Sequence, residues 1–327
     1  MKKQSIIALV FFLQIEIGAS IIWAQTPNRI SIKIPGLTPE GITVHPVHKR
    51  FIVSSVGNGN LIEVDEKGNT KVFADDPALI STLGTHIDPT KKFLVTAICD
   101  IGVSQRSVKA KFGQVASIAF IDLKTQKVTK VIDCTSLIPN SGHFANDVTW
   151  DDKGNLYVTD SFAGAIYKVD KSYHTSVFIA DTTFRLKNQY SFGLNGIAFD
   201  KKTNSLLVSK LDEGKLFKFS VSNPKNFREI LLEKPIPADG ILLSNDGSLI
   251  LVSSINTPND TTTSGKIYKV QSKDQWNSAQ IVDIVDTGMP SATTITQRGK
   301  ELFTVHANYF GKQPVAEFHI QKVSFKK

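Results

Sequence analysis

One short pattern recurs six times along this chain of 327 residues and constrains its fold more than any other feature. Each copy has a first residue that is usually polar, then a small residue, a short apolar run, a turn and a second apolar run. The copies begin at Glu40, Leu83, Asn146, Asn195, Asp239 and Ser291. Their starts lie 43 to 63 residues apart, a spacing typical of the blades of a β-propeller.

The third copy indicates how one unit is built. Its runs of β-branched and aromatic residues occupy 147–150, 156–160, 165–169 and 176–180, and Gly, Asp, Asn or Lys turn residues separate them. Short runs of this composition, bounded by turn residues, are typical of β-strands joined in a meander. No long helical period occurs after residue 24. We therefore predict an all-β chain built from four-stranded antiparallel sheets.

The two ends of the repeat indicate how the units close into a ring. After Ser291 only three strands fit, at 293–296, 302–306 and 315–323, while a strand-like segment at 29–34 precedes the first copy. If that segment is the outer strand of the last unit, the ring is sealed without an open sheet edge at the seam. The sequence thus predicts a six-bladed β-propeller whose last blade is closed by an N-terminal strand.

The first 24 residues have the pattern of an export signal. Lys2 and Lys3 precede an apolar run at 6–13, and a small residue, Ala24, precedes Gln25 at a plausible cleavage point. Gln14 and Glu16 interrupt the apolar stretch, which argues against a permanent span of about 20 residues. We expect residues 1–24 to be a cleaved signal peptide and 25–327 a single domain in the periplasm or outside the cell. An uncleaved anchor is the alternative.

The charge distribution argues against a nucleic-acid partner, and the positions of the two cysteines argue against a disulfide. The net charge of +8 comes from single lysines scattered through the turns, without aromatic–basic stripes, so we expect no nucleic-acid partner. After signal cleavage we expect no membrane contact either. Export would permit a disulfide between Cys99 and Cys134. They fall on strands two apart in one sheet, at roughly 9–10 Å, so two buried free thiols are the favoured interpretation.

The first positions of the repeat suggest a metal site. Structurally equivalent positions in a ring face the same axis, so the side chains of Glu40, Asn146, Asn195 and Asp239 should converge in the central tunnel. Two carboxylates and two amide oxygens suit a hard cation such as Ca²⁺, and no His/Cys spacing typical of zinc is present. The alternative is that each of these residues serves only local turn structure, for which Asn and Asp are common.

Four motifs carry a resemblance to a known family. They are PEGI around Glu40, ANDVTWDDKGNLYVTD from Ala145, YSFGLNGIAFD from Tyr190 and ADGILLSNDG from Ala238. Together they resemble the senescence-marker-protein/gluconolactonase/LRE-like family, in a superfamily with diisopropylfluorophosphatase and the paraoxonases. The resemblance implies one divalent cation, usually calcium, held by the residues that match Glu40, Asn195 and Asp239. It also implies that Asn146 contacts metal or substrate, and that Asp239 acts as nucleophile or general base.

The sequence departs from the gluconolactonase branch of that family near the tunnel mouth. Phe144 stands where that branch has an arginine for a sugar acid, and Tyr190 and Phe192 lie close to Asn195 in sequence. We therefore predict a less polar mouth, with Asn146, Phe144, Tyr190 and Phe192 as substrate-binding residues. In addition to Asp239, His143 is a candidate catalytic residue. We expect it at the rim, the alternative being a solvated loop histidine.

Two classes of function are consistent with these features. The first is a calcium-dependent hydrolase of lactones or other esters, which acts on a small-molecule substrate. The second is a non-hydrolytic propeller, either a small-molecule-binding protein or a relative of strictosidine synthase. The presence of both Glu40 and Asp239 favours the hydrolase.

Overall fold

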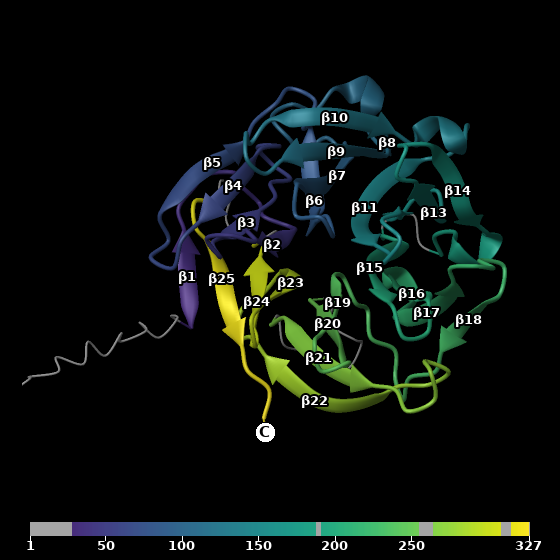
Figure 1. Cartoon of the computed structure of the whole chain (residues 1–327). Helices are drawn as coiled ribbons and strands as arrows, with labels where there is room; N and C mark the ends of the chain where they lie inside the picture. Colours follow the sequence, from purple (N-terminus) through teal and green to yellow (C-terminus); the bar gives the residue numbers. More distant parts are fainter. Residues whose placement is uncertain (1–27, 188–190, 255–263, 309–314, 327) are drawn as a thin grey trace, which may run out of the picture.

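The computed structural model describes residues 28–187, 191–254, 264–308 and 315–326. The predicted signal segment and Tyr190 lie outside these residues. Within them, six β-sheets surround a central axis, and Figure 1 shows the innermost strand of each sheet nearest the centre. The prediction of a six-bladed β-propeller is confirmed.

The first three blades, each given from the axis outward, contain most of the N-terminal half. Blade 1 consists of β2 (Ile42–Val44), β3 (Phe51–Val53), β4 (Leu61–Val64) and β5 (Thr70–Ala74). Blade 2 consists of β6 (Ser81–Ile87), β7 (Phe93–Cys99), β9 (Ser117–Asp122) and β10 (Val128–Asp133). Blade 3 consists of β11 (His143–Trp150), β12 (Leu156–Asp160), β13 (Ala165–Val169) and β14 (Thr175–Ala180). The short β8 (Gln114–Val115) pairs in parallel with β11.

The remaining blades follow in chain order. Blade 4 consists of β15 (Leu194–Asp200), β16 (Ser205–Lys210), β17 (Lys215–Ser220) and β18 (Phe227–Ile230). Blade 5 consists of β19 (Ile241–Leu243), β20 (Leu249–Ser253), β21 (Lys266–Gln271) and β22 (Gln280–Asp286). Blade 6 consists of β23 (Ala292–Arg298), β24 (Glu301–His306), β25 (Phe318–Val323) and β1 (Arg29–Ile32). Single 3₁₀ turns lie between strands: η1 (Lys109–Lys111), η2 (Thr135–Leu137), η3 (Thr182–Phe184) and η4 (Leu211–Glu213).

The N-terminal strand closes the ring as the sequence predicts. β1 pairs antiparallel with β25, from Arg29 opposite Gln321 to Ile32 opposite Phe318. Ile30 and Ile32 are buried in the core that blades 1 and 6 share. One blade therefore contains both ends of the described chain, and its ladder ties residues almost 290 positions apart.

A two-residue interruption at the start of the inner strands sets the register of the ring. In blade 3 the ladder jumps from Ala145–Asp160 to Val148–Val158, so that Asn146 and the next residue bulge out of it. The same jump occurs in blade 4 around Asn195. A bulge of this kind re-aims side chains and is common beside functional sites.

The register of the sixth copy differs from the predicted one. The jump in blade 6 runs from Ala292 to Ile295, which makes Thr293 the counterpart of Asn146, so the start predicted at Ser291 is wrong by two residues. Main-chain bonds between blades agree: Gly196 N–H donates to the Asp239 carbonyl at 2.9 Å, and Gly240 N–H donates to the Thr293 carbonyl at 2.8 Å. Ser291 and Ala292 imitate the polar–small signature of the repeat, and only the pairing shows the offset.

The glycine that follows the first position in four of the copies is required by the close approach of the inner strands. A Cβ atom placed on Gly41 would lie 2.3 Å from the Leu83 carbonyl oxygen, and one on Gly84 would lie 2.2 Å from Oδ1 of Asp147. Larger side chains at these positions would push neighbouring blades apart.

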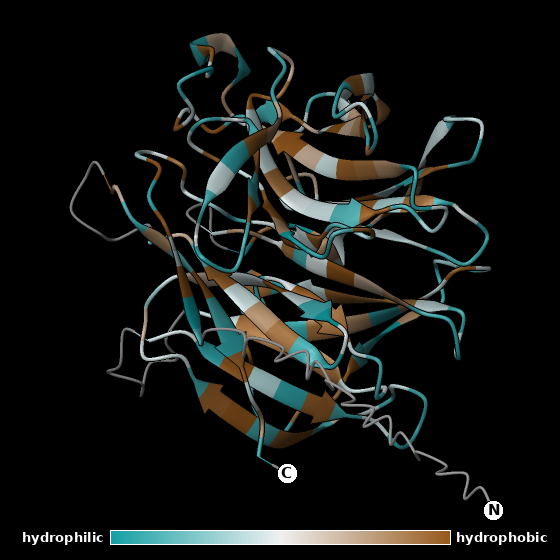
Figure 2. Ribbon diagram, turned by 60° about the vertical axis from the view of Figure 1, so that its left-hand side comes forward, coloured by the Kyte–Doolittle hydropathy of each residue, from teal (hydrophilic) through white to brown (hydrophobic). Residues whose placement is uncertain are grey.

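Apolar side chains fill the spaces between adjacent blades. Figure 2 shows apolar residues, in brown, concentrated in the strands. Cys99 and Cys134 are buried in the cluster shared by blades 2 and 3, and both are free thiols, as expected. Among the described residues, no helix has the length and apolarity needed to cross a membrane.

Candidate functional site

Two of the predicted ligands, Glu40 and Asp239, lie two residues before the inner strands β2 and β19, and the other two, Asn146 and Asn195, lie within the first half of β11 and β15. Glu40, Asn146 and Asn195 are buried, whereas Asp239 keeps some exposed surface. The Asn195 amide donates a hydrogen bond to the Asp239 carboxylate, and the charge of Asp239 acts on Glu40 across the axis. The structure thus brings together residues that are up to 199 positions apart in the sequence.

Sequence reasoning missed a third carboxylate, Asp147. It occupies the position where four of the other copies have glycine, and its side chain fills the space above Gly84. Its Oδ1 accepts from the Val148 N–H at 2.8 Å and its Oδ2 from the Ile197 N–H at 3.2 Å. The signal that could have revealed it is this break in the small-residue pattern of the repeat.

The three carboxylates create a strongly negative centre. Burial, and then the charges of Asp239 and Asp147, raise the pKa of Glu40 well above its usual range. Burial also raises the pKa of Asp239 and that of Asp147 to about 7, against opposing hydrogen bonds from Asn195 and from backbone N–H groups respectively. Like charges at short range in a buried site disfavour ionisation, and a bound cation would remove that penalty.

The Oε2 atom of Glu40 bears on whether this centre holds a cation. Glu40 Oε2 is buried and has no hydrogen-bond partner in the part of the chain that the structure describes. A buried carboxylate oxygen without a partner is costly unless the group is neutral or coordinates a metal. Two amide and two carboxylate side chains fit a hard cation with room for water. Within the described ranges, no three His, Cys, Asp or Glu side chains form a metal cluster, and the predicted ligand set contains two such side chains and two asparagines.

The structure places His143 inside blade 3 and not at a solvated rim. The side chain is buried, with Nδ1 at 2.8 Å from Asp160 Oδ2 and Nε2 at 3.0 Å from the Ile138 carbonyl oxygen. Both ring nitrogens face oxygen atoms that can accept a hydrogen bond, which favours the doubly protonated ring. Although burial opposes the charge, the hydrogen bond and charge of Asp160 raise the pKa of His143. With both ring nitrogens engaged in these contacts, neither is free to take a proton from a substrate or water, and this favours a structural role.

Three phenylalanine side chains pack against one another at blade 3 of the propeller. Phe144 packs on Phe192 with ring centroids 4.9 Å apart. Phe162, which sequence reasoning missed, lies 5.2 Å from Phe144 and stacks on Phe192 at 5.8 Å. Phe162 and Phe192 are each partly exposed. We call these three phenylalanines the aromatic wall; that Phe144 and Phe192 bind substrate stays a prediction.

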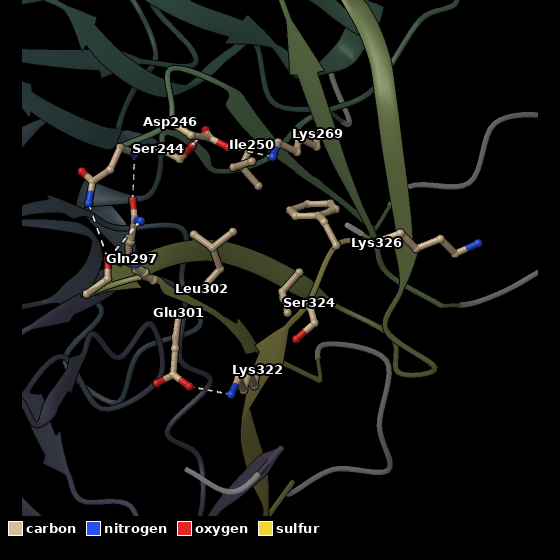
Figure 3. Close-up of a pocket in the computed structure, with 15 residues that line it drawn as sticks. Ser244, Asp246, Ile250, Lys269, Gln297, Glu301, Leu302, Lys322, Ser324 and Lys326 are labelled. Carbon is tan, nitrogen blue, oxygen red and sulfur yellow. Dashed lines mark hydrogen bonds and ion pairs between the residues drawn. The ribbon is translucent and has the colours of Figure 1, made fainter. Parts of the chain in front are cut away.

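A separate cavity of about 710 Å³ lies between blades 5 and 6 (Figure 3). It is lined by the turns that follow β19 and β23, at the end of the inner strands opposite to Asp239 and Thr293. Lys269 lies 2.7 Å from Asp246 and Lys322 lies 2.5 Å from Glu301, so acidic neighbours offset two of its lysines. Its lining includes none of the predicted site residues that the structure describes.

Comparisons with known proteins agree with this architecture. Residues 38–257 match the family described as SMP-30/gluconolactonase/LRE-like region. The search of curated sequences gave no match.

Three solved structures are similar along almost the whole chain. The major allergen Mala s 1 of Malassezia sympodialis is 17% identical, with a TM-score of 0.67 over 91% of this chain and 96% of the other. A gluconolactonase from Xanthomonas campestris is 15% identical, with a TM-score of 0.60 over 90% and 89%. The calcium-binding protein regucalcin from Agrobacterium tumefaciens is 14% identical, with a TM-score of 0.60 over 92% and 95%. At these identities the likeness concerns the fold.

Proposed function

The chain belongs to the SMP-30/gluconolactonase/LRE-like family, and from this premise we propose that it is a calcium-dependent hydrolase of lactones or other esters. The observation that carries the proposal is the buried, unpartnered Oε2 of Glu40 among described residues, beside the carboxylates of Asp239 and Asp147. Such a centre is expensive without a cation and is suited to one of charge +2. Two of the structural neighbours, a gluconolactonase and a calcium-binding protein, support the same proposal.

Each residue has a proposed part in the reaction. Glu40, Asn146, Asn195 and Asp239 would hold the ion, and a bound calcium ion polarises a carbonyl oxygen and stabilises the oxyanion that forms from it. Asp239 would take the proton of the attacking water on its carboxylate. Its partly exposed carboxylate can be reached by water, as a general base requires. The Asn195 amide, bonded to Asp239, would hold that carboxylate in one orientation.

The aromatic wall indicates which substrates the site would accept. Phe162 and Phe192 have partly exposed rings; Phe162 follows Ser161, which contacts Asn146, and Phe192 comes three residues before Asn195. We propose that the wall contacts the alkyl or aryl part of an ester or lactone, since aromatic faces offer a large apolar surface for such groups. Tyr190 stays in this proposal as a substrate-binding residue, on the sequence alone.

A hydrolysis screen tests the proposal. The purified protein, freed of metal and then supplied with calcium, would be assayed against alkyl and aryl lactones, aryl esters, phosphotriesters and sugar lactones. We expect calcium-dependent turnover of the apolar lactones or esters, and much slower turnover of sugar lactones. Saturable binding of these compounds without turnover at any calcium concentration would instead support the second candidate, a non-hydrolytic binding propeller. That candidate is favoured by the aromatic wall, which needs no metal to bind an apolar molecule.

A further inference from the structure

A serine outside the predicted ligand set contacts one of the ligands. Ser161 directly follows β12 and is fully buried. Its Oγ lies 2.6 Å from the carbonyl oxygen of Leu194 and 3.0 Å from Nδ2 of Asn146. Leu194 is the residue before Asn195, so this one hydroxyl links the amide of one predicted ligand to the backbone that carries the next.

The direction of these two hydrogen bonds follows from what each group can do. A carbonyl oxygen only accepts, so the Ser161 hydroxyl must donate its single proton to the carbonyl oxygen of Leu194. Towards Asn146 it can then only accept, and the group that faces it must be the NH₂ of the amide. The other end of the amide, Oδ1, therefore points away from Ser161. With the amide reversed, Oδ1 would face an oxygen that has no proton left to donate.

We propose that Ser161 is a positioning residue for the cation site, where it fixes the amide of Asn146 with its oxygen available to the ion. The proposal rests on the calcium site of the proposed function. A reversed amide would turn two N–H donors towards a cation, which is repulsive. Partners behind the ligands commonly orient them in this way, and their removal typically costs 10–100-fold in metal affinity.

The repeat itself contains a matched control. Ser254 holds the same place in blade 5: its hydroxyl donates at 2.7 Å to the carbonyl of Ala292, the residue before Thr293. The ligand of that blade is Asp239, whose two carboxylate oxygens are equivalent and need no choice of end. The second asparagine, Asn195, has its amide bonded to Asp239 instead of to a serine. Loss of the Ser254 hydroxyl should therefore remove a similar backbone bond without releasing an amide ligand.

Calcium affinity, measured by isothermal titration calorimetry on metal-free protein, tests the role without relying on turnover. We expect Ser161→Ala to weaken calcium binding roughly tenfold and Ser254→Ala to change it less than about twofold, with similar melting temperatures for the two metal-free variants. If Ser161→Ala does not fold, Ser161→Cys, which has a weaker donor and acceptor of similar shape, is expected to weaken binding too. Equal affinities of Ser161→Ala, Ser254→Ala and the parent would overturn the positioning role and leave the calcium site intact.

A double-mutant cycle separates positioning from general support of the fold. In an Asn146→Ala background there is no amide to orient, so Ser161→Ala should cause no further loss of calcium affinity. An undiminished tenfold loss in that background would show that Ser161 acts through the fold and would overturn the proposal. A parent protein that binds no calcium would overturn the proposed site and, with it, this role.

Discussion

At the scale of single residues, we expect Glu40 to destabilise the metal-free protein although it serves as a calcium ligand. Its Oε2 is unpartnered within the described structure, and burial with two neighbouring carboxylates raises its pKa. Glu40→Gln removes the charge at nearly constant volume. We expect the calcium-free variant to melt about 2–4 °C above the calcium-free parent at pH 8, as relief of about 1 kcal/mol would produce. Its melting temperature should rise less than the parent's when calcium is added. Scanning calorimetry with and without calcium measures both, and a parent-like calcium response would contradict the ligand role.

Asp239 is the residue on which the proposed chemistry depends. Asp239→Asn keeps a ligand oxygen and the volume but removes the charge needed to accept a proton. We expect turnover of the best substrate to fall by at least about a hundredfold, while calorimetry still detects calcium binding. His143→Ala is the comparison, because the buried contacts of His143 with Asp160 and Ile138 predict lower stability and near-parental turnover per folded molecule. Parental turnover in Asp239→Asn together with an inactive, folded His143→Ala would reverse the two assignments.

Asp147 predicts a dependence of stability on pH. Burial raises its pKa to about 7, against about 4 in an unfolded chain. Between these values the folded state binds more protons than the unfolded state, so the free energy of unfolding falls as pH rises through this window. His86 and His306, with pKa values lowered to about 4 by burial, titrate in the opposite sense.

A comparison of Asp147→Asn with the parent, both calcium-free, cancels the histidine contributions. The melting temperature of the variant minus that of the parent should become more positive by roughly 5 °C between pH 5 and pH 8. A difference that stays constant across this range would show that Asp147 ionises as an ordinary carboxylate.

The candidate site was predictable to the extent that the repeat marks it. Glu40, Asn146, Asn195 and Asp239 share one position of the pattern, and a ring brings that position to one axis. Ser161 and Phe162 lie in the turn after β12, beyond the two apolar runs of the pattern, and their contacts with Leu194 and Phe192 depend on how neighbouring blades pack. The environment of His143 was unpredictable for a similar reason, because its partner Asp160 comes from the next strand.

At the scale of secondary-structure elements, local pattern located strands better than register. The runs at 156–160 and 165–169 coincide with β12 and β13 because turn residues bound them sharply. The two-residue bulge in the inner strands of blades 2, 3, 4 and 6 has no sequence signature of its own. In blade 6 the pair Ser291–Ala292 therefore concealed that Thr293 takes the ring position.

The N-terminal strand gives a prediction at this scale. Ile32 is fully buried where β1 meets β25, and the next residue, Lys33, is exposed. Ile32→Asp places a charge in the core at the seam and should destabilise by about 3–5 kcal/mol, lowering the melting temperature by roughly 10 °C. Lys33→Asp introduces the same carboxylate on the surface and should change it by less than about 2 °C. Deletion of residues 25–35 should be at least as damaging as Ile32→Asp, since it exposes the edge of β25. A truncated protein that melts like the parent would show that β1 is dispensable for closure.

At the scale of the whole molecule, the ring couples a local site to global stability. The proposed ligands come from blades 1, 3, 4 and 5, and the ring is sealed by the single ladder between β1 and β25. A cation held by four blades resists their separation at the axis, while the ladder resists it at the rim. The free energy of calcium binding should therefore appear as stability of the entire propeller and not of one loop.

This coupling gives the last prediction. A ligand that binds only the folded state stabilises it by RT ln(1 + [L]/Kd), which is about 2.7 kcal/mol at a hundredfold excess over Kd. For a domain of this size that corresponds to a rise of roughly 5–10 °C in melting temperature. Calcium added to metal-free protein should produce such a rise in one cooperative transition, and the rise should grow with the logarithm of calcium concentration. Magnesium should have a smaller effect, because its small, rigid octahedral shell suits amide and carboxylate ligands on four separate strands poorly. An unchanged melting temperature, together with elemental analysis that finds no divalent ion in the purified protein, would exclude calcium from the tunnel and leave the negative centre at Glu40, Asp147 and Asp239 to be neutralised by protons alone.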